Sequence, residues 1–230
     1  MKEQSKQNEQ FSQTPVSGSR YVPMLFSTEM VEAILNGTKN QTRRIIKFPK
    51  DFDTVSVFDN GALGLKYSSN LFDGELKRLY PKLEFGDIIW VRETFTIIPP
   101  NLLFYKADNV ENAKHVKWKP SLFMPKKACR LFLQVVSVTC ERLNDISEND
   151  AKGEGVEDFF GQTDINSSAF RDYMVTKKEI KESPWNGIVD NAIDSYKSLW
   201  EKINGKGRWE LNPWVWVYKF ERIDRPHDYR

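Results

Sequence analysis

The stretch Gly37-Thr38-Lys39-Asn40-Gln41-Thr42-Arg43-Arg44 joins a predicted helix to a predicted strand, and no acidic residue occurs between Gly37 and Lys50. Glycine at this point closes the helix, because it adopts the left-handed conformation without a Cβ penalty. On a strand, Thr42 and Arg44 would share one face, and Lys39 in the turn would reach over that face. The spacing therefore predicts a compact cationic pocket that contains a hydroxyl group.

A second interpretation of the same stretch stays open. Its five basic side chains would form a solvated edge that discourages strand pairing; they are Lys39, Arg43, Arg44, Lys47 and Lys50. Isolated Lys-x-x-Thr patterns are common, so the spacing alone favours this alternative.

The apolar pattern on either side of the stretch predicts an alternation of helices and strands. Ser27 or Thr28 can cap a helix near 29–36, and a second amphipathic helix is expected near 190–203. Strands are predicted from their apolar, aromatic and β-branched content, at 42–48, 88–95, 102–106, 128–142 and 214–220. We expect the 88–95 strand to pair near the 42–48 strand.

These elements predict a single α+β domain over 21–225, with a small barrel of five to six mixed strands flanked by helices. Residues 1–20 are rich in Gln and Ser and are expected to be a disordered tail. Long loop insertions are predicted near 50–80, 96–127 and 156–188, where Gly and Pro interrupt the pattern. The 50–80 insertion is expected to be irregular, with a turn at Asn60-Gly61.

The 230 residues carry a formal net charge of only +2, but the charges are segregated along the chain. The segment 114–130 has six basic residues and no acid, and 144–158 is strongly acidic. With Trp118 inside the basic segment, nucleic acid or a phosphorylated ligand is the expected partner, and a solvated basic loop is the alternative.

Two cysteines, two histidines and no Cys-x-x-Cys motif predict reduced thiols and no zinc site, although carboxylates could still hold Mg²⁺. We expect no structural metal and no cofactor. No stretch has the apolar length of a signal peptide core or a membrane span. We therefore expect a cytoplasmic protein without a membrane partner.

Four motifs in order resemble the ASCH family of the PUA-like superfamily of small β-barrels. They are Gly37-x-Lys39-x-x-Thr42-x-Arg44, Gly86-Asp87-Ile88-Ile89-Trp90-Val91-Arg92-Glu93, Ser147-Glu148-x-x-Ala151-x-x-Glu154-Gly155 and Asn212-Pro213-Trp214-Val215-Trp216-Val217. The segment Lys119-Pro120-Ser121-Leu122-Phe123-Met124-Pro125 is similar to the longer ASCH proteins often carried by phages and prophages.

The resemblance implies binding of RNA or of a modified nucleoside or nucleotide in a basic pocket around Lys39, Thr42 and Arg44. Some small ASCH members are metal-independent amidohydrolases that deacylate N4-acylated cytidine. By that resemblance Lys39 is the base, Thr42 the nucleophile and Glu154 the proton donor. A ribonuclease that uses the same site is a further alternative. The residues predicted to bind substrate are Arg43, Arg44, Trp90, Arg92, Glu93 and Trp118.

The chemistry requires a particular geometry. Lysine acts as a base near neutral pH only where burial or a neighbouring cation such as Arg44 lowers its pKa from about 10.4. Lys39, Thr42 and Glu154 are therefore expected to converge, with Lys39 within hydrogen-bond reach of Thr42 or one water away, and with Arg43 pointing toward solvent or an acidic partner. An enclosed Lys39 would favour an enzyme, and an open groove would favour binding.

Overall fold

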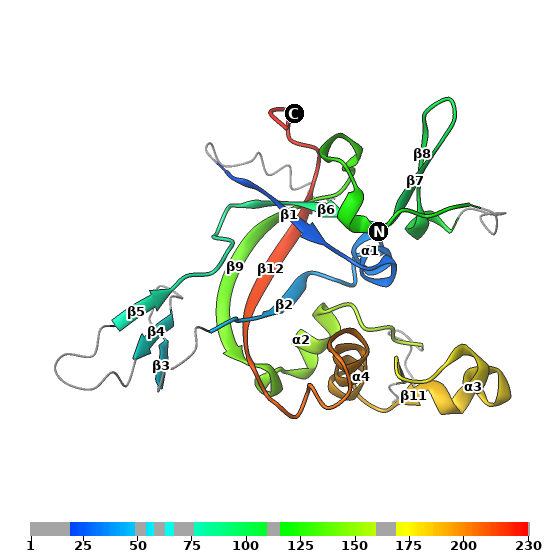
Figure 1. The fold of residues 1–230 in the computed structure, drawn as a ribbon. Helices are drawn as coiled ribbons and strands as arrows, with labels where there is room; N and C mark the ends of the chain where they lie inside the picture. The colour runs from blue at the N-terminus through cyan, green and yellow to red at the C-terminus, as the bar shows by residue number, and fades with distance from the viewer. Residues whose placement is uncertain are drawn as a thin grey trace, which may run out of the picture.

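The computed structural model describes residues 19–48, 54–57, 63–66, 76–109, 116–159 and 169–229. The chain forms an α+β fold around a five-stranded mixed sheet in the order β1-β6-β9-β12-β2 (Figure 1). The strands are β1 (Tyr21–Leu25), β2 (Gln41–Ile45), β6 (Ile88–Arg92), β9 (Phe132–Arg142) and β12 (Trp214–Ile223). β1 pairs with β6 in parallel and the other pairs are antiparallel. The predicted 1–20 tail and the turn at 60–61 lie outside the described residues, apart from 19 and 20.

The long antiparallel pair β9 and β12 forms the curved centre of the sheet (Figure 1). On β12, Trp216, Tyr218 and Phe220 pack into one hydrophobic cluster, whereas Val215 and Val217 pack into another on the opposite face. This alternation follows from the two-residue period of a strand. Both faces of the sheet are therefore covered, one by α1 (Thr28–Leu35) and the other by α4 (Ala192–Asn204).

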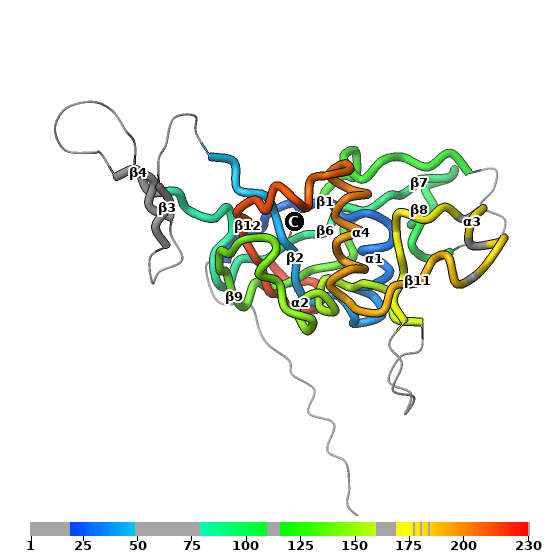
Figure 2. Tube along the Cα trace, turned by 90° about the horizontal axis from the view of Figure 1, so that it is seen from below, coloured from blue at the N-terminus to red at the C-terminus, as the bar shows by residue number. Residues whose placement is uncertain are grey.

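Two shorter α-helices of the described residues are α2 (Glu148–Gly153) and α3 (Lys177–Glu182). α4 begins after Asn191, whose side chain accepts a hydrogen bond from the Asp194 amide at 2.7 Å, and this cap satisfies a free N–H of the first turn. α2 and α4 lie beside β2 in both views (Figures 1 and 2). No helix in the described ranges has the length and apolar content needed to cross a membrane.

The segments predicted as loop insertions contain regular structure. The 50–80 segment is not simply irregular, because it contains a three-stranded antiparallel sheet of β3 (Thr54–Val57), β4 (Leu63–Lys66) and β5 (Leu76–Leu79). The other two contain the hairpin of β7 (Phe95–Ile98) and β8 (Leu102–Tyr105), and the pair β10 (Phe170–Arg171) and β11 (Ile188–Val189).

One prediction about strand pairing needs correction, and the sheet contains one strand that was not predicted. The apolar residues after Tyr21 form β1, an edge strand, and Pro23 fits there because an edge position needs no N–H donor on its outer side. β6 pairs with β1 and β9, so two strands separate it from β2. No backbone ladder joins the edge strands β1 and β2 within the described residues, and closure into a barrel stays a prediction.

Candidate functional site

The turn after α1 places Lys39 against the end of α2. Gly37 has a φ of +76°, as expected for a glycine that ends a helix, and the amides of Thr38 and Lys39 both donate to Ala33 O at 2.9 and 3.1 Å. Lys39 then forms an isolated β-bridge with Glu154. The turn is therefore held by backbone hydrogen bonds from two directions.

A bulge in β9, opposite the step from Lys219 to Phe220 of β12, lies on the other side of this turn. The pairing of β12 with β9 shifts between Lys219 and Phe220, and the Phe220 amide donates to Asn40 O at 2.8 Å. The Asn40 amide in turn donates to Gly153 O at 2.9 Å. The turn is therefore hydrogen-bonded to β12 on one side and to the end of α2 on the other.

Lys39, Glu154 and Arg43 form a buried ion network. Lys39 Nζ donates to Glu154 Oε2 and to Glu154 O, both at 2.8 Å. Arg43 Nη1 donates to Glu154 Oε1 at 3.0 Å, and Arg43 Nε donates to Glu141 Oε1 at 2.8 Å. The Lys39 and Arg43 side chains are 0% exposed and that of Glu154 is 3% exposed. Each oxygen of the Glu154 carboxylate therefore faces its own cation.

The surroundings of Lys39 affect its pKa in two directions. Burial lowers the pKa of Lys39, Glu154 opposes that change, and the charges of Arg44 and Arg43 lower the pKa further, so that the net shift is downward. Burial would also lower the pKa of Arg43, but Glu154 and Glu141 outweigh burial and raise it. Arg43 thus stays a cation beside Glu154, whichever protonation state Lys39 adopts.

A pocket of about 240 Å³ lies between β2 and α4. It is lined by Met30, Thr42, Arg43, Arg44, Ile45, Lys47, Glu154, Tyr196, Leu199, Trp200, Ile203 and Asn204. Thr42, Glu154 and Tyr196 are at most 4% exposed and form its inner end, whereas Ile45 and Ile203 are 43% and 51% exposed and mark its mouth. Among the described residues, neither the Thr42 hydroxyl nor the Tyr196 hydroxyl has a hydrogen-bond partner.

The positions of the two arginines partly differ from the prediction. Arg44 lines the pocket, and its Nη2 donates to Leu25 O at 3.1 Å. Arg43 meets acidic partners, as expected, but it also lines the pocket. Adjacent residues of a strand normally point to opposite faces of the sheet. Arg43 and Arg44 nevertheless both line one pocket, because β2 is an edge strand. Lys39 Nζ is bonded to Glu154 and not to Thr42.

The remaining predicted site residues lie away from this pocket. Trp90 packs in a hydrophobic cluster with Phe132 and Tyr229. Glu93 is 1% exposed and binds Arg130 through both carboxylate oxygens at 2.9 Å.

Arg92 stacks over the Trp90 ring, 5.5 Å from its centroid, and donates to Leu122 O. Trp118 is half-buried beside Lys119. Neither lines the pocket between β2 and α4.

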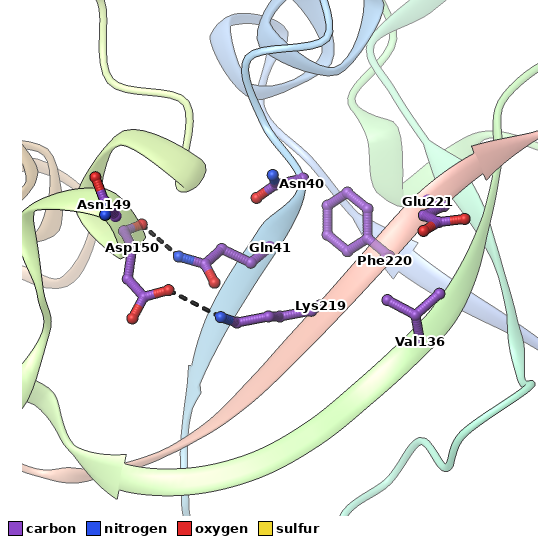
Figure 3. Close-up of a pocket in the computed structure, with 8 residues that line it drawn as sticks. All are labelled: Asn40, Gln41, Val136, Asn149, Asp150, Lys219, Phe220 and Glu221. Atoms are coloured by element: carbon purple, nitrogen blue, oxygen red, sulfur yellow. Dashed lines mark hydrogen bonds and ion pairs between the residues drawn. The ribbon is translucent and has the colours of Figure 1, made fainter.

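A second pocket, of about 360 Å³, opens between α2, β2 and β12 (Figure 3). Gln41 donates to Asp150 O, and Lys219 Nζ donates to Asp150 Oδ1 at 3.0 Å. Figure 3 shows both side chains pointing toward Asp150 from neighbouring strands. No local pattern identified Glu141, Asp150 or Tyr196 as neighbours of Arg43, because each is about a hundred residues or more away along the chain.

The close approach of the turn to α2 depends on Gly155. Gly155 has a φ of +82°, and a Cβ there would lie 2.8 Å from the Cβ atoms of Ala33 and Lys39. We expect Gly155→Ala to lower the free energy of unfolding by about 2–4 kcal/mol, through backbone strain and steric overlap, as measured by urea denaturation. Gly207→Ala is the matched control, since its φ is +78° with nothing within 4 Å; it should cost about 1 kcal/mol. Equal losses of unfolding free energy in the two variants would show that the turn at Lys39 does not pack tightly against Gly155.

Comparison of the chain with models of known protein families, with curated proteins and with solved structures gave no match.

Proposed function

We propose that this chain is an ASCH-like protein with a PUA-like barrel, and that the pocket between β2 and α4 binds a nucleoside or nucleotide, free or within RNA. The four ordered sequence motifs support the family assignment. The contact of Lys39 with Glu154 supports it further, because it brings together two motifs 115 residues apart. The hydrogen bond from Arg44 to Leu25 O links the two edge strands, which supports a barrel-like curvature.

The observation that carries the binding proposal is the unbalanced charge of the pocket. Glu154 is neutralised by Lys39 and Arg43, whereas Arg44 and Lys47 have no carboxylate partner among the described residues. The facing wall is apolar and aromatic, with Tyr196, Leu199 and Trp200 from one face of α4. A flat base with an attached phosphate has the matching chemistry, because its ring packs on apolar side chains and its charge meets cations.

Blocking the mouth of the pocket tests this proposal. We expect Ile203→Trp to weaken binding of cytidine 5′-monophosphate by about tenfold or more, because a larger side chain at this half-exposed position fills the entrance. Isothermal titration calorimetry with cytidine, its monophosphate and N4-acetylcytidine measures the effect.

Leu211→Trp is the control, since Leu211 is 62% exposed and does not line the pocket. It should bind each ligand as the unchanged chain does. The proposal is wrong if the unchanged chain binds none of the three ligands and no RNA, or if the two tryptophan variants lose binding equally.

A second candidate function is metal-independent hydrolysis of an N4-acylated cytidine. The specific observation in its favour is the complete burial of Lys39, which lowers its pKa toward the range of a base. Neutral Lys39 would take the Thr42 proton through one water, as the Thr42 oxygen attacks the acyl carbon. The hydrogen bond from Lys39 Nζ to Glu154 then offers a route for the proton to Glu154 and to the leaving N4 amine. Water would release the acyl group from Thr42 in a second step.

A further inference from the structure

Basic side chains gather at the end of β6 and along the segment 117–127. The five cations are Arg92, Lys117, Lys119, Lys126 and Lys127. None of them has a carboxylate partner in the part of the chain that the structure describes. Glu93 and Asp108, two acidic side chains of this region, are already neutralised, because Arg130 pairs with both. We call these five residues, with Leu122 and Phe123, the basic track.

A series of contacts connects the pocket to this track across the end of β1. Arg44 in the pocket donates to Leu25 O, and Leu25 is the register partner of Arg92 on β6. Arg92 donates to Leu122 O, at the start of the exposed apolar pair. A ligand that leaves the pocket past Arg44 therefore meets Arg92 and then the 117–127 segment.

The track presents exposed apolar side chains on a fixed loop. Leu122 and Phe123 are 57% and 67% exposed. The next residue, Met124, is 1% exposed and its Sδ accepts a hydrogen bond from the Glu93 amide at 3.1 Å. The loop is thus anchored while its aromatic side chain faces solvent, an arrangement typical of a binding surface.

We infer that the basic track holds the flanking backbone of a single-stranded RNA whose target nucleotide occupies the pocket. This inference rests on the proposed function. The buried inner end of the pocket, formed by Thr42, Glu154 and Tyr196, admits one base, so that base must be unpaired. Lysines beside an exposed phenylalanine match the alternation of phosphates and bases in a single strand, because the cations meet phosphates and the ring stacks on a base.

The inference predicts that the track contributes to oligonucleotide binding and not to mononucleotide binding. The variant Lys119→Glu with Lys127→Glu should weaken binding of an RNA of about ten nucleotides by about tenfold or more, and reduce the slope of log affinity against log salt by about 1.4. Phe123→Ala should weaken binding of the same RNA by about fivefold or more, because the stacking of its ring on a base is lost. Affinity for cytidine 5′-monophosphate should stay unchanged in both variants. Fluorescence anisotropy over a series of salt concentrations measures the affinity for the RNA, and the same titration is repeated with a DNA strand of the same sequence.

Lys178→Glu with Lys181→Glu is the matched control, because both lysines are exposed on α3 and lie outside the track. The track is refuted if its variants bind RNA as tightly as the unchanged chain, or if the α3 control loses as much RNA affinity as the track variants. It is also refuted if the unchanged chain binds the oligonucleotide no tighter than the mononucleotide. Tighter binding of DNA than of RNA would also refute the assignment to RNA. Loss of RNA binding only in the track variants, with no mononucleotide bound by any form, would support the track and contradict the proposed function.

Discussion

We expect Glu154→Gln to lower the free energy of unfolding by about 3–5 kcal/mol, as measured by urea denaturation at neutral pH. The substitution preserves the shape of the side chain but removes the only carboxylate bound to Lys39 in the described residues. The Lys39 side chain is 0% exposed, so bulk solvent does not compensate its charge. Arg43 keeps Glu141 as a partner, and the loss therefore falls mainly on Lys39.

An exposed ion pair provides the control for this prediction. Glu210→Gln makes the same chemical change opposite Lys197, where the two side chains are 69% and 42% exposed, and it should cost less than about 1 kcal/mol. The double variant Lys39→Met with Glu154→Gln should be more stable than Glu154→Gln alone, because it leaves no uncompensated lysine. A loss in Glu154→Gln no larger than in Glu210→Gln would show that the network is hydrated.

The same variant should show a distinct pH dependence. Without Glu154, nothing opposes the effect of burial, and the pKa of Lys39 falls further below its ordinary value. Between the lowered pKa and about 10.4, the unfolded chain binds a proton that the folded chain does not, so stability rises with pH in that window. The measurement should stop near pH 10, because burial raises the pKa values of Tyr21 and Tyr105 to about 12 and the folded state loses stability above their unfolded value.

Local patterns were sufficient for the elements that bury a regular apolar face. β9 and β12 were predictable from their apolar, aromatic and β-branched content, and α4 from its helical spacing. β1 was not, because a five-residue strand with Pro23 becomes a strand only through its parallel partner β6. The pairing of β6 likewise depended on β1, which the pattern did not identify.

The candidate site was predictable only in part. The resemblance to the ASCH motifs indicated Lys39, Thr42 and Glu154, and the structure places Lys39 against Glu154, with Thr42 and Glu154 lining one pocket. The burial of Arg43 was not predictable, because its acidic neighbours come from β9 and α2, about a hundred residues away. Tyr196 was expected only as part of the core, but it also lines the pocket, since α4 covers an edge strand.

If the chain deacylates N4-acetylcytidine, Thr42→Val should abolish the reaction, with a loss of about a thousandfold or more in kcat/KM. The Thr42 hydroxyl has no hydrogen-bond partner among the described residues, so its replacement by a methyl group leaves no buried polar group unsatisfied. The side chain is also nearly unchanged in volume. Stability and ligand affinity should therefore change little, and release of acetate, followed by mass spectrometry, isolates the chemical step.

Thr42→Ser separates the hydroxyl group from the rest of the side chain. Serine retains the nucleophilic oxygen, so the variant should keep measurable turnover, and an acetyl group should be trapped on residue 42 in the unchanged chain and in Thr42→Ser but not in Thr42→Val. If Thr42→Val still deacylates the nucleoside, another group attacks the acyl carbon and the assigned nucleophile is wrong. If neither the unchanged chain nor Thr42→Ser releases acetate while both bind the nucleotide, Lys39 and Glu154 serve to hold the turn and the pocket is a binding site. That outcome would agree with the hydrogen bonds already observed, since both donor contacts of Lys39 Nζ go to Glu154.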